Sequence, residues 1–148
     1  MALPLVSKDL QRLRIRLSYD GTDFYGWQKQ PNVEPTIQGL IEQKVSQIYN
    51  RSVAVVASGR TDRGVHALNQ WAHFDLPKSA DVSNLSYKLQ RMTPDSITIK
   101  SVESCPTKFH AQISAVSKCY FYRIRVADLP TPLGREYCWQ RSQPLNLD

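Results

Sequence analysis

The chain has 148 residues, of which 41% are hydrophobic, 22% charged and 9% aromatic, and this composition excludes a disordered or membrane-embedded protein. Its length allows one sizeable core, so we expect a single domain over residues 1–148, with its core at 13–126 and an irregular tail at 127–148. The formal net charge of +6 favours an anionic partner, either nucleic acid or an acidic surface.

The sequence shows the pattern of neither a targeting signal nor paired cysteines. Residues 1–9 lack the basic, apolar and small-residue regions of a signal peptide, and no later apolar run has the length of a bilayer span. We therefore expect a cytoplasmic protein with no membrane partner. Cys105, Cys119 and Cys138 have the spacing of neither a zinc site nor a disulfide framework, so we interpret them as reduced thiols.

Strand and helix patterns follow one another from residue 14 onward. Residues 14–19 alternate polar and apolar side chains, the pattern of a half-buried strand. Residues 36–49 carry apolar side chains at helical spacing behind Thr36, a suitable N-cap. Two further strands are predicted at 53–57 and 71–76, separated by a polar stretch that contains glycine.

The pattern continues with one helix and two strands. Residues 82–92 place their apolar side chains on one helical face, and residues 96–102 predict a strand. The order is then βαββαβ, which is the ferredoxin-like α+β arrangement if the sheet is antiparallel with both helices on one face. Residues 120–126 alternate again and predict an additional strand, after which prolines interrupt the tail.

The loop at residues 58–66 is the most informative stretch of the sequence. Two glycines bracket Asp62, which lies between Arg60 and Arg63. Nearby positive charge favours the ionised carboxylate, which can act as nucleophile, base or ion-pair partner, and the arginines could grip phosphate. The structural alternative is a connection between strands in which the aspartate caps a turn and pairs with an arginine. From the loop alone, that alternative is favoured.

Five blocks in the same order resemble the TruA family of tRNA pseudouridine synthases. The first resembles the opening motif of the family and the start of its first helix, the second its active-site signature, and the third the strand that follows. The blocks are residues 19–30 with 36–38, then 59–67, 70–74, 109–111 and 118–122. The resemblance covers residues 14–126 and adds pseudouridine synthase-like architecture to the expected fold.

The resemblance implies a role for three residues. Asp62 aligns with the carboxylate that attacks uridine, at the ribose C1′ or at the base, so that the base can detach, rotate and rejoin through carbon. Arg60 would hold Asp62 by an ion pair and help to separate stacked bases, and Tyr120 would stack on the flipped uracil or assist its proton removal. Packing in a strand is the structural alternative for Tyr120. The implied partner is tRNA or another structured RNA, with no cofactor and no metal.

Five more residues are candidate RNA contacts. Arg63 could bind phosphate. His66 and His110 could contact phosphate, although bracing the loop is the favoured interpretation. Tyr25 could join an aromatic and basic patch, but aromatic residues beside a glycine turn more often cover a core. Lys118 precedes the strand predicted at 120–126 and could form a basic face with its arginines, for which an ordinary solvated surface is the alternative.

Family members extend beyond the length of this chain through a second ferredoxin-like unit. Within the matched part, Gln112 stands where the family usually has arginine, and Cys119 where a charged residue is frequent. Three explanations stay open: a piece of a longer protein, a half-length enzyme, or a relative that keeps the fold without catalysis.

The leading hypothesis is a half-length isomerase that converts uridine to pseudouridine in tRNA or another structured RNA. Two copies joined through a sheet edge would imitate an enzyme with two similar units, so we expect a homodimer. The alternatives are a non-catalytic RNA-binding module or RNA chaperone, and a partner-binding ferredoxin-like protein without a nucleic-acid role.

Overall fold

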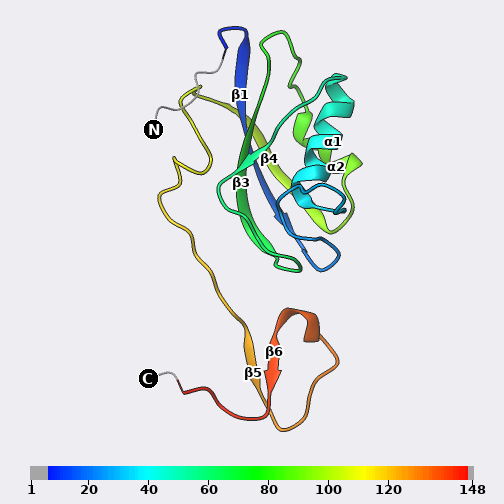
Figure 1. The fold of residues 1–148 in the computed structure, drawn as a ribbon, viewed down its shortest axis with the longest axis vertical. Coiled ribbons are helices and arrows are strands. Elements are labelled where there is room, and N and C mark those ends of the chain that lie inside the picture. The colour runs from blue at the N-terminus through cyan, green and yellow to red at the C-terminus, as the bar shows by residue number, and fades with distance from the viewer. Residues whose placement is uncertain (1–6, 147–148) are drawn as a thin grey trace. The chain divides into compact units, whose positions relative to one another are not determined.

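The computed structural model describes residues 7–146, which divide into two compact units (Figure 1). The first unit ends at Ala115 and the second begins at Val116. The single domain expected over residues 1–148 stays a prediction, because compactness alone does not establish that a unit folds independently. Among the residues described, no helix is long and apolar enough to cross a membrane.

The first unit is an antiparallel sheet of four strands with two helices on one of its faces (Figure 1). Its strands lie in the order β2-β3-β1-β4. In chain order the elements are β1 (Leu10–Tyr19), α1 (Ile37–Tyr49), β2 (Val56–Ala57), β3 (Ala67–Pro77), α2 (Leu85–Met92) and β4 (Ile97–Cys105). The predicted βαββαβ order and the ferredoxin-like α+β fold are therefore confirmed.

Alternation along β1 decides which face of the sheet carries the core. Leu13, Ile15 and Leu17 are fully buried on the helix side. The register pairs Leu13 with Phe74 and Ile15 with Ala72 of β3, and both of these residues are buried as well. Because side chains alternate between the two faces of a strand, the even-numbered residues of β1 point to the face without helices.

Helix α1 begins and packs as its sequence predicts. The Thr36 hydroxyl oxygen accepts a hydrogen bond from the Gly39 amide at 3.2 Å, so Thr36 is the N-cap. The buried apolar residues of α1 are Ile37, Ile41 and Val45. Helix α2 is shorter than the predicted 82–92 and starts at Leu85, after a turn in which the Leu85 amide donates to the Val82 carbonyl at 3.2 Å.

The strand predicted at residues 53–57 is wrong over most of its length. Only Val56–Ala57 pairs with β3. The Val55 amide instead donates to the Glu42 carboxylate of α1 at 3.0 Å. A side chain of the helix therefore satisfies this backbone donor next to the short strand.

The second unit contains a small parallel sheet rather than an irregular tail. Strand β5 (Ile124–Val126) pairs with β6 (Trp139–Arg141), and a short 3₁₀ helix at Arg135–Tyr137 lies between them in the chain. The predicted strand at 120–126 is thus confined to its last three residues. The expectation of an irregular segment at 127–148 is wrong for β6, because alternation over three residues is too short to be distinguished from a loop.

Candidate functional site

The loop at residues 58–66 connects β2 to β3 and is fastened at its first turn. The Ser58 amide donates to the Trp71 carbonyl at 2.7 Å, and the Gln70 side-chain amide donates to the Gly59 carbonyl at 2.6 Å. The Ser58 hydroxyl lies 2.9 Å from the side-chain oxygen of Gln70. Since Gln70 is buried, these bonds hold the start of the loop against the sheet.

A second loop, which follows β1, packs along the first. The Trp27 amide donates to the Thr61 carbonyl at 2.9 Å, and the Gly64 amide donates to the Phe24 carbonyl at 3.2 Å. The hydroxyl groups of Tyr19 and Thr61 share a hydrogen bond of 2.9 Å. Burial raises the pKa of Tyr19, so its hydroxyl stays protonated at neutral pH. The carbonyl and the hydroxyl of Thr61, the residue before Asp62, are therefore held by Trp27 of the neighbouring loop and by Tyr19 at the end of β1.

Two glycines in the block at residues 19–30 allow this close approach. Gly26 has φ of +86°, and a Cβ added there would lie 2.6 Å from the Thr61 carbonyl oxygen. A Cβ on Gly21 would overlap the Val65 carbonyl. The two sequence blocks that resemble family motifs thus meet in space, and glycine is required at the contact.

Asp62 lies at the exposed turn of the fastened loop. Its carbonyl accepts a hydrogen bond from the Val65 amide at 3.1 Å, and Gly64 has φ of +77°. Within residues 7–146, neither Arg60 nor Arg63 forms an ion pair with the Asp62 carboxylate. All three side chains are exposed. The carboxylate is therefore available to a ligand, and the ion-pair role expected of Arg60 stays a prediction.

An open depression of about 400 Å³ surrounds Asp62. Both loops contribute to its walls, and the Arg63 guanidinium lies 4.4 Å from the centre of the Tyr25 ring, a cation–π contact. The lining residues are Tyr25, Gln28, Gln30, Val33, Arg60, Thr61, Asp62 and Arg63. One carboxylate, two guanidinium groups and an aromatic ring thus face the same space.

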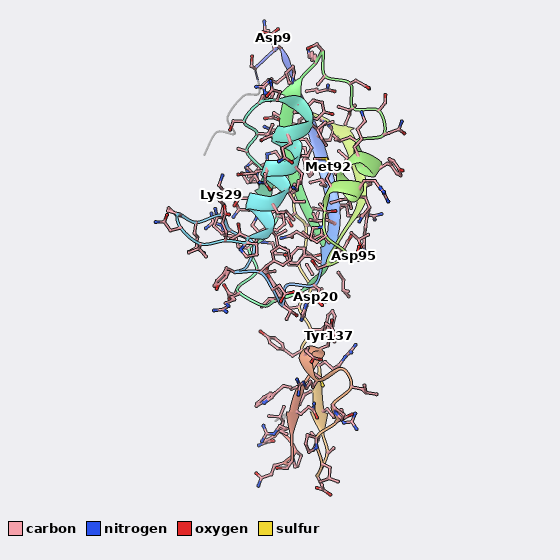
Figure 2. All side chains as sticks on the ribbon, turned by 90° about the vertical axis from the view of Figure 1, so that its right-hand side faces the viewer. Asp9, Asp20, Lys29, Met92, Asp95 and Tyr137 are labelled. Atoms are coloured by element: carbon pink, nitrogen blue, oxygen red, sulfur yellow. The ribbon has the colours of Figure 1, made fainter. Side chains whose placement is uncertain are left out.

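Part of this lining escaped sequence reasoning. Gln28 and Gln30 lie within the quoted block at residues 19–30, but amide side chains in a loop carry no distinctive signal. Val33 lies outside every matched block. Lys29, between the two glutamines and labelled beside α1 in Figure 2, forms an ion pair of 3.3 Å with Glu42 of that helix. This contact fixes the loop that carries both glutamines.

His66 has the contacts of a residue that braces the two loops. Its Nδ1 atom lies 3.1 Å from the Gly21 amide nitrogen and 3.0 Å from a carboxylate oxygen of Asp20. Neutral Nδ1 accepts from the amide, whereas protonated Nδ1 donates to the carboxylate. These contacts support the bracing interpretation, and a contact with RNA stays a prediction.

His110 is not among the residues that line the depression. Its ring lies 4.7 Å from that of His73 in β3. His73 is buried, and its Nδ1 atom accepts a hydrogen bond from the Ala111 amide at 3.1 Å. Burial is the main cause that lowers the pKa of His73 to about 4. This histidine, which sequence reasoning did not single out, fastens the segment of His110 to the sheet in its neutral form.

Tyr120 and Lys118 belong to the second unit. Both side chains are exposed there, with Tyr120 72% exposed. Both residues precede β5, which begins at Ile124. Their roles in stacking and RNA contact stay predictions.

The antiparallel α+β sheet with two helices is consistent with a pseudouridine synthase-like fold. A family model described as tRNA pseudouridine synthase matches residues 16–112, which include both loops. The chain is 40% identical over 139 residues to tRNA pseudouridine synthase A of Geobacillus sp. (strain WCH70), covering 93% of this chain and 56% of that relative. It is 39% identical over 142 residues to the protein of the same name from Limosilactobacillus reuteri (strain DSM 20016), covering 94% and 55%.

A third relative, tRNA pseudouridine synthase A of Mycoplasma genitalium, is 40% identical over 132 residues, which cover 89% of this chain and 53% of the relative. The chain belongs to the tRNA pseudouridine synthase family. It spans about half the length of the curated relatives it matches.

Proposed function

We propose that the chain acts as a half-length pseudouridine synthase-like isomerase, which converts uridine to pseudouridine in tRNA or another structured RNA. The observation that supports this function best is the exposed Asp62 carboxylate in a depression of about 400 Å³ that also presents Arg60, Arg63 and Tyr25. The names of the relatives agree with tRNA as the substrate. Because tRNA is a cytoplasmic substrate, we propose a cytoplasmic location.

Asp62 would act as the nucleophile, with no cofactor and no metal. Its carboxylate would attack the ribose C1′ while the bond from C1′ to N1 of uracil breaks, or would add to the base itself. After the base rotates, C5 would bond to C1′, the bond to Asp62 would break, C5 would lose its proton and N1 would gain one. The reaction is an isomerisation, so no atom is gained or lost overall.

The arginines of the loop would supply the charge for RNA binding. A guanidinium can bind phosphate through two parallel hydrogen bonds, and the stacking of Arg63 on Tyr25 at 4.4 Å directs one such group into the depression. Extrusion of a base from a stacked helix costs a few kcal/mol. An aromatic side chain offsets that cost by roughly 1–3 kcal/mol per base, which is the role we propose for Tyr120. We also retain His66, His110 and Lys118 as proposed RNA contacts.

We further propose that the enzyme works as a homodimer. Strands β2 and β4 form the two edges of the four-stranded sheet, and an uncovered edge is a natural place for a second copy to pair. Sedimentation of a dilute sample should give the mass of a dimer. Only monomer at every concentration would remove this part of the proposal.

A second candidate is an RNA-binding module without catalysis. It is favoured by one observation, namely that Arg60 and Arg63 are both exposed at the depression and can bind phosphate without any bond being made or broken. Under this alternative the net charge of +6 and the arginines of the loop would still bind RNA, but no isomerisation would follow.

The decisive experiment uses unmodified tRNA that contains uridine labelled with tritium at C5. Isomerisation releases that tritium to water, because C5 exchanges its hydrogen for the bond to ribose. The protein should release tritium, and Asp62→Asn should abolish the release with tRNA binding nearly unchanged. Asp95→Asn is the matched control, since Asp95, labelled in Figure 2, is exposed and lies outside the depression. Binding of tRNA without release by any of the three proteins would favour the non-catalytic alternative.

A further inference from the structure

The sheet face without helices carries an aromatic and basic cluster that the site around Asp62 does not use. Trp71 of β3 pairs directly with Arg16 of β1, and Arg14 lies one side-chain position further along the same face. The guanidinium carbons of Arg14 and Arg16 lie 5.2 Å and 5.6 Å from the centre of the indole ring. We call these three residues the Trp71 cluster.

The Trp71 cluster has an excess of positive charge. Arg14 forms an ion pair of 2.6 Å with Glu103 of β4, and hydrogen bonds from Arg14 lower the pKa of that carboxyl. Arg16 forms no ion pair within residues 7–146, and its buried Nε has no hydrogen-bond partner there. The hydrogen-bonding capacity of Arg16 is therefore only partly used.

Lys100 adds a third cation to this face. Its ammonium nitrogen donates to the Leu68 carbonyl of β3 at 2.6 Å. Strand β1 lies between β4 and β3, so the Lys100 side chain must cross β1. The helix side of β1 is filled there by Leu17, which is fully buried, so the crossing lies on the open face.

The cluster is not part of the hydrophobic core. Trp71 is absent from the buried core residues, although its strand neighbour Ala72 is fully buried among them. The side chains of Arg14 and Glu103 are 40% and 45% exposed. A large aromatic side chain beside two guanidinium groups on a partly exposed sheet face has the chemistry of a base-stacking surface.

We propose that the Trp71 cluster is a second RNA-contact surface, on which an unpaired base stacks while an adjacent phosphate is drawn to Arg16. RNA fits this surface better than an acidic peptide does, because bases stack on both indole and guanidinium planes. The inference rests on the proposed function in one respect, namely that the partner is RNA. It does not depend on the proposed isomerisation.

The cluster is linked to the loop of Asp62 through β3. The backbone carbonyl of Trp71 accepts the 2.7 Å hydrogen bond from the Ser58 amide at the start of that loop. The indole and the loop are therefore anchored at the same residue. An RNA segment bound around Asp62 can continue onto the sheet face without leaving the first unit, and substitution of the Trp71 side chain retains the backbone bond.

The test measures binding of fluorescently labelled, unmodified tRNA by anisotropy at several salt concentrations. Trp71→Leu should weaken binding roughly five- to hundredfold, and Trp71→Phe should restore part of the loss. Arg16→Gln should lower the slope of log affinity against log salt by about one. Lys88→Gln is the matched control with the same charge change, because Lys88 lies exposed on α2 and outside the cluster. It should bind like the unaltered protein.

The inference would be overturned if Trp71→Leu and Arg16→Gln bound tRNA as tightly as Lys88→Gln does. This holds even if the unaltered protein releases tritium. Competition by polyglutamate as effective as competition by unlabelled tRNA would overturn it too, since charge alone would then explain binding. If circular dichroism shows that Trp71→Leu does not fold, the salt dependence of tRNA binding by Arg16→Gln decides the test. Dependence on Trp71 in a protein that releases no tritium would sustain this inference while the proposed catalysis fails.

Discussion

The two units of the chain hold their apolar residues in opposite ways. Every buried apolar side chain among residues 7–146 lies between Leu13 and Ala111. In the second unit, Tyr120, Tyr122 and Leu133 are 72%, 90% and 85% exposed. A two-stranded sheet is at best marginally stable by itself. A core therefore stabilises the first unit, whereas the second is held by the pairing of β5 with β6 and by hydrogen bonds such as those between Gln140 and Thr131.

The two units also differ in how firmly they hold the residues that we propose for the function. The loop of Asp62 is fixed by bonds to Gln70, Trp27 and Phe24, all of which are buried. Tyr120 has no comparable support, because it is exposed in its own unit. The second copy of the proposed homodimer would have to cover Tyr120. Conditions that change the stability of the Asp62 loop should therefore differ from those that change the activity of the enzyme.

The largest contrast is expected from apolar truncations in the two units. Ile15→Ala removes a fully buried side chain and should lower the free energy of unfolding by about 2–5 kcal/mol. Leu133→Ala removes an exposed side chain and should change it by about 0.5 kcal/mol or less. Urea titration followed by circular dichroism measures both. Equal losses would show that the second unit has a core of its own.

Acid should weaken the first unit through His73. All three histidines lie in that unit, and burial lowers the pKa of His73 from 6.5 to about 4. Between these values the unfolded chain binds more protons than the folded one, so the free energy of unfolding falls as the pH drops through this window. The loss should be on the order of 1–3 kcal/mol.

Urea titrations at several pH values between 6.5 and about 4 would measure this loss. Comparison with His73→Gln isolates the histidine from carboxylates, which also begin to titrate there. The variant should have a flatter pH dependence. The same slope in both proteins would assign the acid sensitivity to other groups.

Alanine substitutions at two glycines with positive φ test whether close packing against the glycine distinguishes the first unit from the second. Gly26 and Gly134 have φ of +86° and +72°, but a Cβ would lie 2.6 Å from the Thr61 carbonyl oxygen at Gly26 and would meet nothing within 4 Å at Gly134. Gly134→Ala should cost about 1–2 kcal/mol from backbone strain alone. Gly26→Ala should cost more, and should also reduce tRNA turnover, because the loop of Asp62 has to move. Equal costs with normal turnover would mean that the loops are not tightly coupled.

The sequence predicted the first unit well because its signals are long and mutually consistent. Alternation over residues 14–19 and helical spacing over 36–49 each bury one face, and both elements are present. The strand expected at 53–57 pairs with β3 only at Val56–Ala57, and the Val55 amide is bound by Glu42, 13 residues away. A tertiary hydrogen bond of this kind leaves no local pattern.

Three residues that line the depression could be predicted from the sequence, but the contacts that hold them could not. Asp62, Arg60 and Arg63 were evident from the glycine-containing loop, and the structure places all three around one depression. The contact of Gly26 with Thr61 was not predictable, because it depends on how two loops cross in space. Strand β6 was not predictable either, because three residues are too few to show alternation. Its pairing with β5 depends on contacts with a strand that is distant in the sequence.

The smallest contrast concerns one cation–π pair in each unit. The Arg63 guanidinium carbon lies 4.4 Å from the ring centre of Tyr25, and that of Arg141 lies 5.2 Å from the indole of Trp139. Exposed pairs of this kind contribute about 0.5–1 kcal/mol, so Tyr25→Leu and Trp139→Leu should lower stability by similar small amounts. Only Tyr25→Leu should also weaken tRNA binding, since it releases Arg63 from the depression around Asp62. Equal loss of tRNA affinity in both variants would assign the RNA contact to aromatic surface in general rather than to this depression.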